Sequence, residues 1–202
     1  WKSRGLGDVY KRQVKAGVRV MASRIEEPAF DVIDSYVDFE IRRYVDTVQA
    51  QVRTSGRAGE AASGGFRRVA RYIFGGNAQQ TSIAMTAPVS MWEEDGSGWL
   101  AFTMPRAYSI DSLPQPNDED VRLVARAGST VAVMKFSGRN TPGKADRIEN
   151  KLRAAMEREG HQPHGPAVLA LYDNPWTTLP FLRRNELHIE LAAHSSPSPQ
   201  KS

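Results

Sequence analysis

The chain has 202 residues, of which 40% are hydrophobic, and this is enough to bury one sizeable core or two small ones. No apolar run approaches the roughly 20 residues that a helix needs to span a bilayer. Cysteine is absent, which excludes a disulfide framework, a thiolate metal site and a thiol nucleophile.

The net charge of +4 by itself favours a nucleic-acid partner. However, residues 3 to 13, SRGLGDVYKRQ, match the translation of a common sequencing adapter, and we interpret residues 1 to 13 as non-native. Removing their four basic residues and one acidic residue leaves 23 basic and 22 acidic residues, so we predict no nucleic-acid partner. On this interpretation the natural sequence before Val14 is missing, and a signal or anchor there is out of view. The lack of cysteine favours a cytoplasmic location without fixing it.

The first native elements are predicted to be strands. Residues 28 to 53 alternate apolar and polar side chains and are rich in β-branched and aromatic residues. Val37 and Asp38 are the expected turn of a first hairpin. The stretch GRAGEAASGG is typical of a small flexible connection, which leads into a helix over residues 64 to 74. The motif GGN directly after this helix is a C-terminal stop signal.

The pattern of strands and helix then occurs a second time. The strands SIAMTAPVSMWEE and SGWLAFTMP are joined by a DGSG hairpin turn, and SLPQPNDED is a predicted loop. Residues 39 to 56 and 121 to 138 align without a gap, and both read as strand, turn, strand and Ser-Gly. A helix over residues 144 to 160 and two strands, PAVLALYDN and ELHIEL, follow the second copy.

The predicted fold class is α+β, with a single domain over residues 26 to 191. Two pseudo-symmetric β-β-α-β-β repeats, about residues 28 to 105 and 120 to 191, are expected to form a distorted β-barrel with one helix per half. A duplication of this kind leaves a groove between the halves, which is a natural place for a ligand. Residues 192 to 202 have the composition of a disordered tail.

The helix over residues 64 to 74 combines three arginines with three aromatic side chains. One interpretation is an ordinary amphipathic helix with a solvated basic face. The other is one wall of a site for a flat, apolar, anionic ligand, whose carboxylates would accept forked hydrogen bonds from Arg67 and Arg71. The helix has three faces. An apolar face carries Phe66, Val69, Ala70 and Ile73, a second face carries Arg67, Arg71 and Phe74, and a third carries Arg68 and Tyr72.

The loop DNPWTTLPFLRRNE is the other unusual segment, because it joins prolines and large aromatic residues to two arginines. In one interpretation, Trp176 and Phe181 cover one end of the core. In the other, they form a binding site together with Arg183 and Arg184, since binding residues concentrate on loops of this kind.

No spacing in the chain indicates a metal or catalytic site. His161 and His164 form an HxxH motif in a turn without a nearby carboxylate, so we predict no metal site. His188 alternates with inward-facing neighbours, and we expect its side chain to be solvated. GxSxG, phosphate-loop and GxGxxG motifs are absent, so we predict no enzymatic activity. The candidates for a titratable group, should the groove hold an active site, are Tyr72, Tyr172 and Glu186.

A family resemblance runs through most of the chain. In order, the motifs EEPAFDVIDSYVDFEIRRY, GGFRRVARYIFGGN, IAMTAPVSM, FTMP, VAVMKFSG and YDNPWTTLPFLRRNELHIEL resemble the SOUL haem-binding protein family. The resemblance covers about residues 26 to 191, and the combination of MTAPV, FSG and RRNE in this order is specific. It implies one α+β domain with a distorted barrel, and reversible, non-covalent binding of haem or a related tetrapyrrole.

The resemblance also implies a site, between the first helix and the loop before the last strand. Phe66 and Ala70 match positions of the apolar wall, and Arg71 matches a basic position suited to a propionate. Thr177 stands where some members have lysine, so the second cation would come from Arg183. The haem-contacting residues predicted in this way are Phe66, Arg67, Ala70, Arg71, Phe74, Trp176, Phe181 and Arg183.

One departure from the family bears on the iron. Some members ligate it through a histidine in the N-terminal half, whereas this chain has no histidine before His161. Affinity would therefore depend on the apolar pocket, and we expect a monomer that acts as a carrier, buffer or sensor. Two alternatives remain open: an enzyme of unknown reaction in the same groove, and a protein-interaction domain whose groove takes a partner helix.

Overall fold

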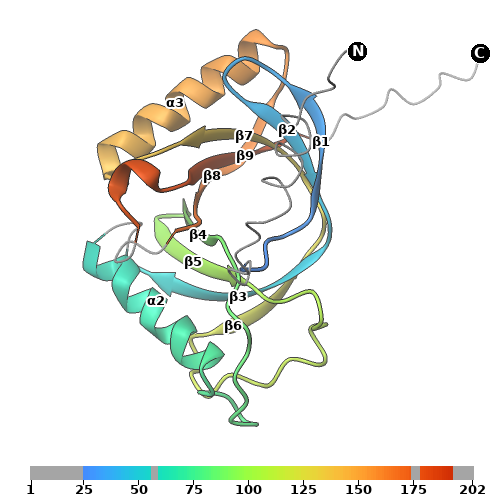
Figure 1. Cartoon of the computed structure of the whole chain (residues 1–202), viewed down its shortest axis with the longest axis vertical. Helices are drawn as coiled ribbons and strands as arrows, with labels where there is room; N and C mark the ends of the chain where they lie inside the picture. Colours follow the sequence, from blue (N-terminus) through green and yellow to red (C-terminus); the bar gives the residue numbers. More distant parts are fainter. Residues whose placement is uncertain (1–24, 56–58, 174–177, 193–202) are drawn as a thin grey trace, which may run out of the picture.

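The computed structural model describes residues 25–55, 59–173 and 178–192, and the fold over these residues is α+β. Two helices cover one side of a large antiparallel sheet (Figure 1). The predicted adapter, the C-terminal tail and Trp176 lie outside the described residues. The elements are β1 (Phe30–Ser35), β2 (Glu40–Tyr44), β3 (Thr47–Thr54), α2 (Gly59–Ile73), β4 (Val89–Glu94), β5 (Ser97–Thr103), β6 (Arg122–Arg126), β7 (Thr130–Phe136), α3 (Pro142–Arg158), β8 (Pro163–Leu171), the 3-10 turn η1 (Pro180–Leu182) and β9 (Asn185–Leu191).

The sheet is strongly curved, but among the described residues it does not close into a barrel. Its nine strands run in the order β1-β2-β7-β9-β8-β4-β5-β3-β6, so that β1 and β6 form the two ends. Figure 1 shows the sheet bent into an arc, with both helices on its outer side. The predicted α+β class is thus confirmed, and the open, curved antiparallel sheet is compatible with the predicted distorted barrel.

The strand order has a symmetry that bears on the predicted repeat. The segments aligned in the sequence become β2 and β3 in the first half and β6 and β7 in the second. If β2, β3, β4 and β5 are taken to correspond to β6, β7, β8 and β9, swapping each strand for its counterpart reverses the strand order between β2 and β6. The sheet therefore has an approximate twofold symmetry in its strand order. This arrangement agrees with two related halves, although the duplication itself stays a prediction.

Both predicted hairpin turns are present. β1 and β2 pair antiparallel around Val37 and Asp38. In the second hairpin, β4 and β5 pair around Asp95 and Gly96, whose φ angles are 49° and 69°. Two consecutive positive φ angles give a turn whose twist matches that of the strands, which explains the Asp-Gly sequence there.

Helix α2 begins earlier than the sequence indicated and ends where it indicated. The segment expected to be a flexible connection is helical from Gly59, because the alanines and the glutamate in GEAAS favour helix. At the other end, Gly76 N–H donates to the Arg71 carbonyl at 2.8 Å and Gly75 N–H to the Tyr72 carbonyl at 3.4 Å. Gly75 has φ +100°, so the glycine pair completes a Schellman motif.

The close approach of α2 to the sheet explains one of its glycines. A Cβ atom on Gly65 would lie 2.6 Å from Cγ2 of Thr54 and 3.2 Å from Cγ1 of Val52, whereas one on Gly64 would meet nothing within 4 Å. Gly65 therefore lets the helix lie directly on β3, and Gly64 is not needed for packing.

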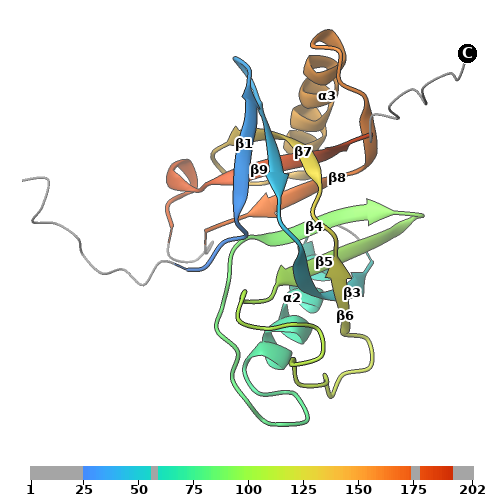
Figure 2. The same ribbon diagram turned by 90° about the vertical axis from the view of Figure 1, so that its right-hand side faces the viewer.

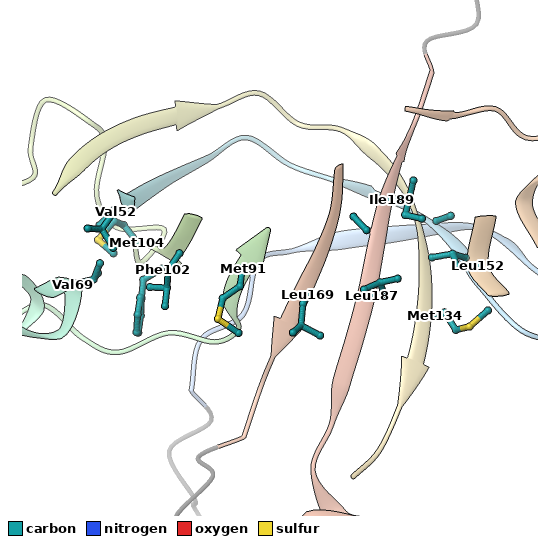
Figure 3. Close-up of a cluster of buried hydrophobic side chains, with 14 of the residues drawn as sticks. Val52, Val69, Met91, Phe102, Met104, Met134, Leu152, Leu169, Leu187 and Ile189 are labelled. Atoms are coloured by element: carbon teal, nitrogen blue, oxygen red, sulfur yellow. The ribbon is translucent and has the colours of Figure 1, made fainter. Parts of the chain in front are cut away.

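Successive residues of each strand point to opposite faces of the sheet. One face carries the apolar core, to which Val69 of α2 and Leu152 of α3 contribute; Figure 3 shows this cluster running between the two halves. The other face is concave and more polar. In Figure 2 it is turned toward the viewer, with both helices behind the strands. No helix in the described part of the chain is long and apolar enough to cross a membrane.

Candidate ligand-binding site

Helix α2 presents an apolar stripe that the described part of the protein leaves partly exposed. Phe66, Ala70 and Phe74 follow one another at four-residue spacing and so lie on one side of the helix and the residue that follows it. Phe66 is 40% exposed and Phe74 is 64% exposed, while Ala70 is half-buried. The Phe66 ring touches Phe102 with the ring centroids 5.4 Å apart, so the stripe begins at the core and runs outward.

A basic stripe lies beside the apolar one. Arg67 and Arg71 are exposed, and neither guanidinium has a hydrogen-bond or ion-pair partner among the described residues. Phe66, Ala70 and Phe74 thus border two cations without a partner in the described chain, an arrangement that fits both interpretations of the helix.

The third face of α2 is structural. Arg68 forms ion pairs with Asp118 at 3.5 Å and Asp120 at 2.5 Å, which fasten the helix to the loop before β6. Tyr72 is 1% exposed, its hydroxyl donates to the Pro114 carbonyl at 2.9 Å, and burial raises its pKa to about 12. Arg68 and Tyr72 therefore stabilise the fold, and we assign them no ligand contact.

The second predicted wall is also apolar and exposed where the structure describes it. Leu179, Phe181 and Leu182, in and beside η1, are 57%, 68% and 64% exposed. Arg183 is half-buried, and its Nε donates to the Thr178 carbonyl at 3.0 Å, which orders the end of the loop. This part of the chain lies on the helix-bearing side of the sheet in Figure 1. Trp176, the remaining predicted contact, lies outside the described residues.

The opposite face of the sheet holds a polar cluster that the sequence analysis missed. Arg42 on β2 and Glu186 on β9 are 2% and 2% exposed, and two hydrogen bonds of 2.8 and 3.1 Å join them. Glu186 also accepts from the Tyr172 hydroxyl at 2.7 Å, and its Oε2 lies 3.0 Å from Nε2 of His188. The Tyr44 hydroxyl accepts from Arg42 at 2.9 Å. The available signal was the alternation of polar residues along ELHIE and EIRRY, which places each set on one strand face.

The protonation of this cluster follows from its contacts. Burial alone would raise the pKa of Glu186, but hydrogen bonds from His188, Arg42 and Tyr172 hold that pKa well below its ordinary value. Burial, together with the neighbouring Glu186 charge, raises the pKa of Tyr172 far above its ordinary value. Arg42 and Glu186 therefore form a charged pair, and Tyr172 stays a neutral donor.

Two sequence-based interpretations change with this finding. His188 is not solvated as expected, because its side chain lies on the concave face against Glu186, with 14% of it exposed. The candidates for an active-site group do not meet in one groove either. Tyr72 belongs to α2 and is buried against the fold, whereas Tyr172 and Glu186 lie in the cluster on the opposite face. Among the described residues no group of three potential ligands could hold a metal ion.

Two well-formed pockets in the described part of the chain lie away from the α2 surface. One, of about 390 Å³, is lined by the concave face, including Trp92, Trp99 and His188. The other, of about 1060 Å³, lies between the start of β1 and the chain after β5, with Arg43 and Tyr108 in its walls. None of the predicted haem contacts that the structure describes lines either hollow. The predicted site is thus an exposed surface formed by α2, with η1 on the same side of the sheet.

Comparison with solved structures places the fold. The chain is similar to the C-terminal domain of EcmrR, with a TM-score of 0.59 and 8% identity over 75% of this chain and 95% of that one. It is also similar to a hydrolase from Listeria innocua, with a TM-score of 0.52 and 13% identity over 91% and 98% of the two chains. At these identities the likeness concerns the fold alone.

Sequence comparison places the family. The chain is 31% identical over 103 residues to heme-binding protein 2 of Homo sapiens, and 30% identical over 103 residues to that of Mus musculus. Each match takes in 48% of this chain and 50% of the relative, so the chain spans about half the length of the curated relatives it matches. The model of the SOUL heme-binding protein family matches residues 25–190, nearly all of the described chain. This confirms the resemblance seen in the motifs: the chain belongs to the SOUL heme-binding protein family.

Proposed function

We propose that the chain binds haem or a related tetrapyrrole reversibly on the surface formed by α2 and the loop before β9, as a carrier, buffer or sensor without chemistry of its own. The observation that carries this proposal is the pairing on α2 of an uncovered apolar stripe, Phe66 to Phe74, with two uncommitted cations, Arg67 and Arg71. A tetrapyrrole has the same two parts, a flat apolar face and an edge with two carboxylates. Family membership supports haem as the ligand.

Binding would be non-covalent and would not depend on a histidine of this surface. The chain has no cysteine to form a thioether bond, and no histidine occurs in residues 59 to 74 or 172 to 184. A hydrogen bond of 2.8 Å joins Nε2 of His161 to the Tyr36 hydroxyl, and Nε2 of His188 lies against the Glu186 carboxylate. These two imidazoles are therefore already engaged by the fold.

The apolar and basic parts of the surface have different tasks. A solvent-exposed arginine–propionate pair contributes about 0–1 kcal/mol. Burying several hundred Å² of porphyrin face, at roughly 25 cal/mol per Å², gives about 10 kcal/mol before the costs of association. The aromatic side chains would thus supply the affinity, while Arg67 and Arg71 orient the ligand and select for negative charge.

The test is an absorbance titration of haemin, with metal-free protoporphyrin in parallel. A saturable one-to-one Soret shift with both ligands is the expected result, because the surface offers no iron ligand. Saturation with haemin alone would mean that an iron ligand exists elsewhere in the chain. If neither ligand saturates below tens of micromolar, on the order of 10⁻⁵ M, the proposal is wrong.

The division of tasks has its own test. Trp176→Ala should weaken haemin binding more than Arg71→Ala, because an indole contributes apolar contact and an exposed arginine contributes mainly orientation. The opposite order would contradict the assignment of affinity to the aromatic side chains.

A further inference from the structure

The concave face of the sheet contains a pocket that the haem proposal does not use. It has a volume of about 390 Å³, within the roughly 300–1,000 Å³ range of small-molecule sites. Its walls come from strands of both halves, and among the described residues no side chain of α2 or η1 lines it. The nine-stranded sheet itself separates it from the surface formed by α2.

One end of the pocket is a flat aromatic wall. Trp92 on β4 and Trp99 on β5 are directly opposite each other in the ladder, and both are half-buried. Their ring centroids lie 6.2 Å apart, and the ring planes are 13° from parallel. Two nearly parallel indoles in a hollow provide a surface on which a planar ring system can stack.

Next to this wall are amide groups with unused hydrogen-bonding capacity. The Gln51 side-chain Nε2 donates to Gln49 Oε1 at 2.9 Å, and this is the one side-chain hydrogen bond that either amide makes within the described chain. Gln51 is 8% exposed as a whole, and its carbonyl oxygen is not among the buried side-chain atoms without a partner, so this acceptor is accessible. A ligand with an N–H group could donate a hydrogen bond to this oxygen without breaking the bond between Gln51 and Gln49.

The charges of the pocket favour a cation. Glu190 pairs with Arg126 at 3.3 Å, while Glu94 has the Trp92 indole N–H, at 3.4 Å, as its partner and no cation in the described chain. Arg53 lies just outside the lining and donates to the Ser97 hydroxyl, opposite Glu94 in the ladder. Glu94 is the one carboxylate of the lining without an ion-pair partner among the described residues. The buried pair of Arg42 and Glu186 behind the wall adds no net charge. Indole faces also attract cations.

We propose that this concave pocket is a second ligand site, which binds a flat aromatic monocation with N–H groups along its edge. The ligand stacks on Trp92 and Trp99, donates to the Gln51 carbonyl oxygen, and places its charge near Glu94. The two faces of the sheet then select ligands of opposite charge, and the two sites can be occupied together.

The probe for the test is proflavine, a flat tricyclic monocation with two amino groups, with the dianion fluorescein as its counterpart. The full chain has four tryptophans, so Trp1→Phe and Trp176→Phe leave Trp92 and Trp99 as the reporters. We expect saturable quenching of their emission by proflavine, none by fluorescein, and no displacement of proflavine by saturating haemin. Saturation that fails below about 1 mM, equal binding of fluorescein, or displacement by haemin would overturn the proposal.

Adjacent glutamates provide a matched pair of variants. Glu94 lines the pocket, whereas Glu93 points to the other face of the same strand, and both are exposed at the hairpin end. Glu94→Gln should weaken proflavine binding about twofold to fivefold, and Glu93→Gln should leave it unchanged. Gln51→Leu should weaken proflavine binding more than Glu94→Gln does, although it leaves the net charge of the protein unchanged. Equal effects of the two glutamate variants would place the probe outside the pocket.

Discussion

Helices α2 and α3 occupy corresponding places in the two halves of the fold, and they differ in what they leave unused. Every basic side chain of α3 has a partner: Lys144 and Arg147 donate to the Ser137 and Gly143 carbonyls, and Lys151, Arg153 and Arg158 pair with Asp38, Glu149 and Glu159. Its apolar stripe is buried, with Leu152 and Met156 at 0% exposure. On α2, by contrast, Phe66 and Phe74 are exposed, and Arg67 and Arg71 have no partner among the described residues.

The difference indicates which features this scaffold requires. Helix α3 shows that a helix can be held on the sheet with no large apolar side chain exposed in its described part and with all its cations engaged. The extra aromatic surface and the free cations of α2 are therefore not needed to build the fold. This is the strongest structural argument for a ligand at α2, and the following variants test it in order of expected effect.

The largest effect should come from removing a carboxylate from the buried cluster around Arg42. Glu186→Gln removes one of the two carboxylates that Arg42 contacts, the other being Glu40. Breaking a buried pair costs about 3–5 kcal/mol, and because Glu40 remains we expect the lower end of this range, about 3 kcal/mol. Glu190→Gln, in the exposed pair with Arg126, should cost less than about 1 kcal/mol. Urea denaturation at neutral pH measures both, and equal costs would contradict the buried pairing.

The same variant predicts a pH dependence. The folded-state pKa of Glu186 lies below its ordinary value, so its contribution to stability is fully present above about pH 4.5 and is lost as the pH falls through the folded-state pKa. The stability difference between the wild type and Glu186→Gln should therefore be constant near neutral pH and shrink in acid.

The next prediction compares how much an apolar side chain of each helix contributes to the free energy of unfolding. Leu152→Ala should lower the free energy of unfolding by about 2–5 kcal/mol, because it opens a cavity in the core beneath α3. Phe74→Ala should change it by no more than about 0.5 kcal/mol, since that ring is 64% exposed. A large loss from Phe74→Ala would mean that the apolar stripe of α2 serves the fold after all.

Haemin affinity should show the opposite order. Phe74→Ala should weaken it about tenfold, which corresponds to about 1.4 kcal/mol, because the ring would be covered by the porphyrin face. Val37→Ala, at a fully exposed position in the β1–β2 turn, is the control and should have no effect. Absorbance titration distinguishes the two, and equal affinities for all three proteins would remove α2 from the site.

The smallest effect concerns the cations. Arg71→Ala should weaken haemin binding by at most about fivefold, and less in high salt, because exposed ion pairs are weak and screened. Arg153→Ala on α3, whose guanidinium is already paired with Glu149, should leave the affinity unchanged. If Arg153→Ala weakens binding as much, the charge of the whole protein rather than the surface of α2 attracts the ligand.

Local signals in the sequence determined much of this protein. The Asp-Gly turn, the glycine pair after Phe74 and the alternation of Leu187 with Ile189 act over a few residues, and the structure confirms each of them. The motifs identified the family, and the spacing of Phe66, Ala70 and Phe74 grouped the apolar side chains of α2. These features depend on backbone geometry within one element, which neighbouring residues fix.

Tertiary structure decided the rest. Arg68 is paired, whereas Arg67 has no partner within residues 25–55, 59–173 and 178–192. This difference depends on where the loop carrying Asp118 and Asp120 lies, and no spacing within α2 contains that information. The meeting of Arg42 with Glu186 joins residues 144 positions apart through the pairing of β2, β7 and β9. Likewise, His188 looked like a solvated residue because alternation tells which face a side chain takes, but only the curvature of the sheet encloses that face. Contacts between distant segments arise from the packing of the whole chain, so a single sequence leaves them undetermined.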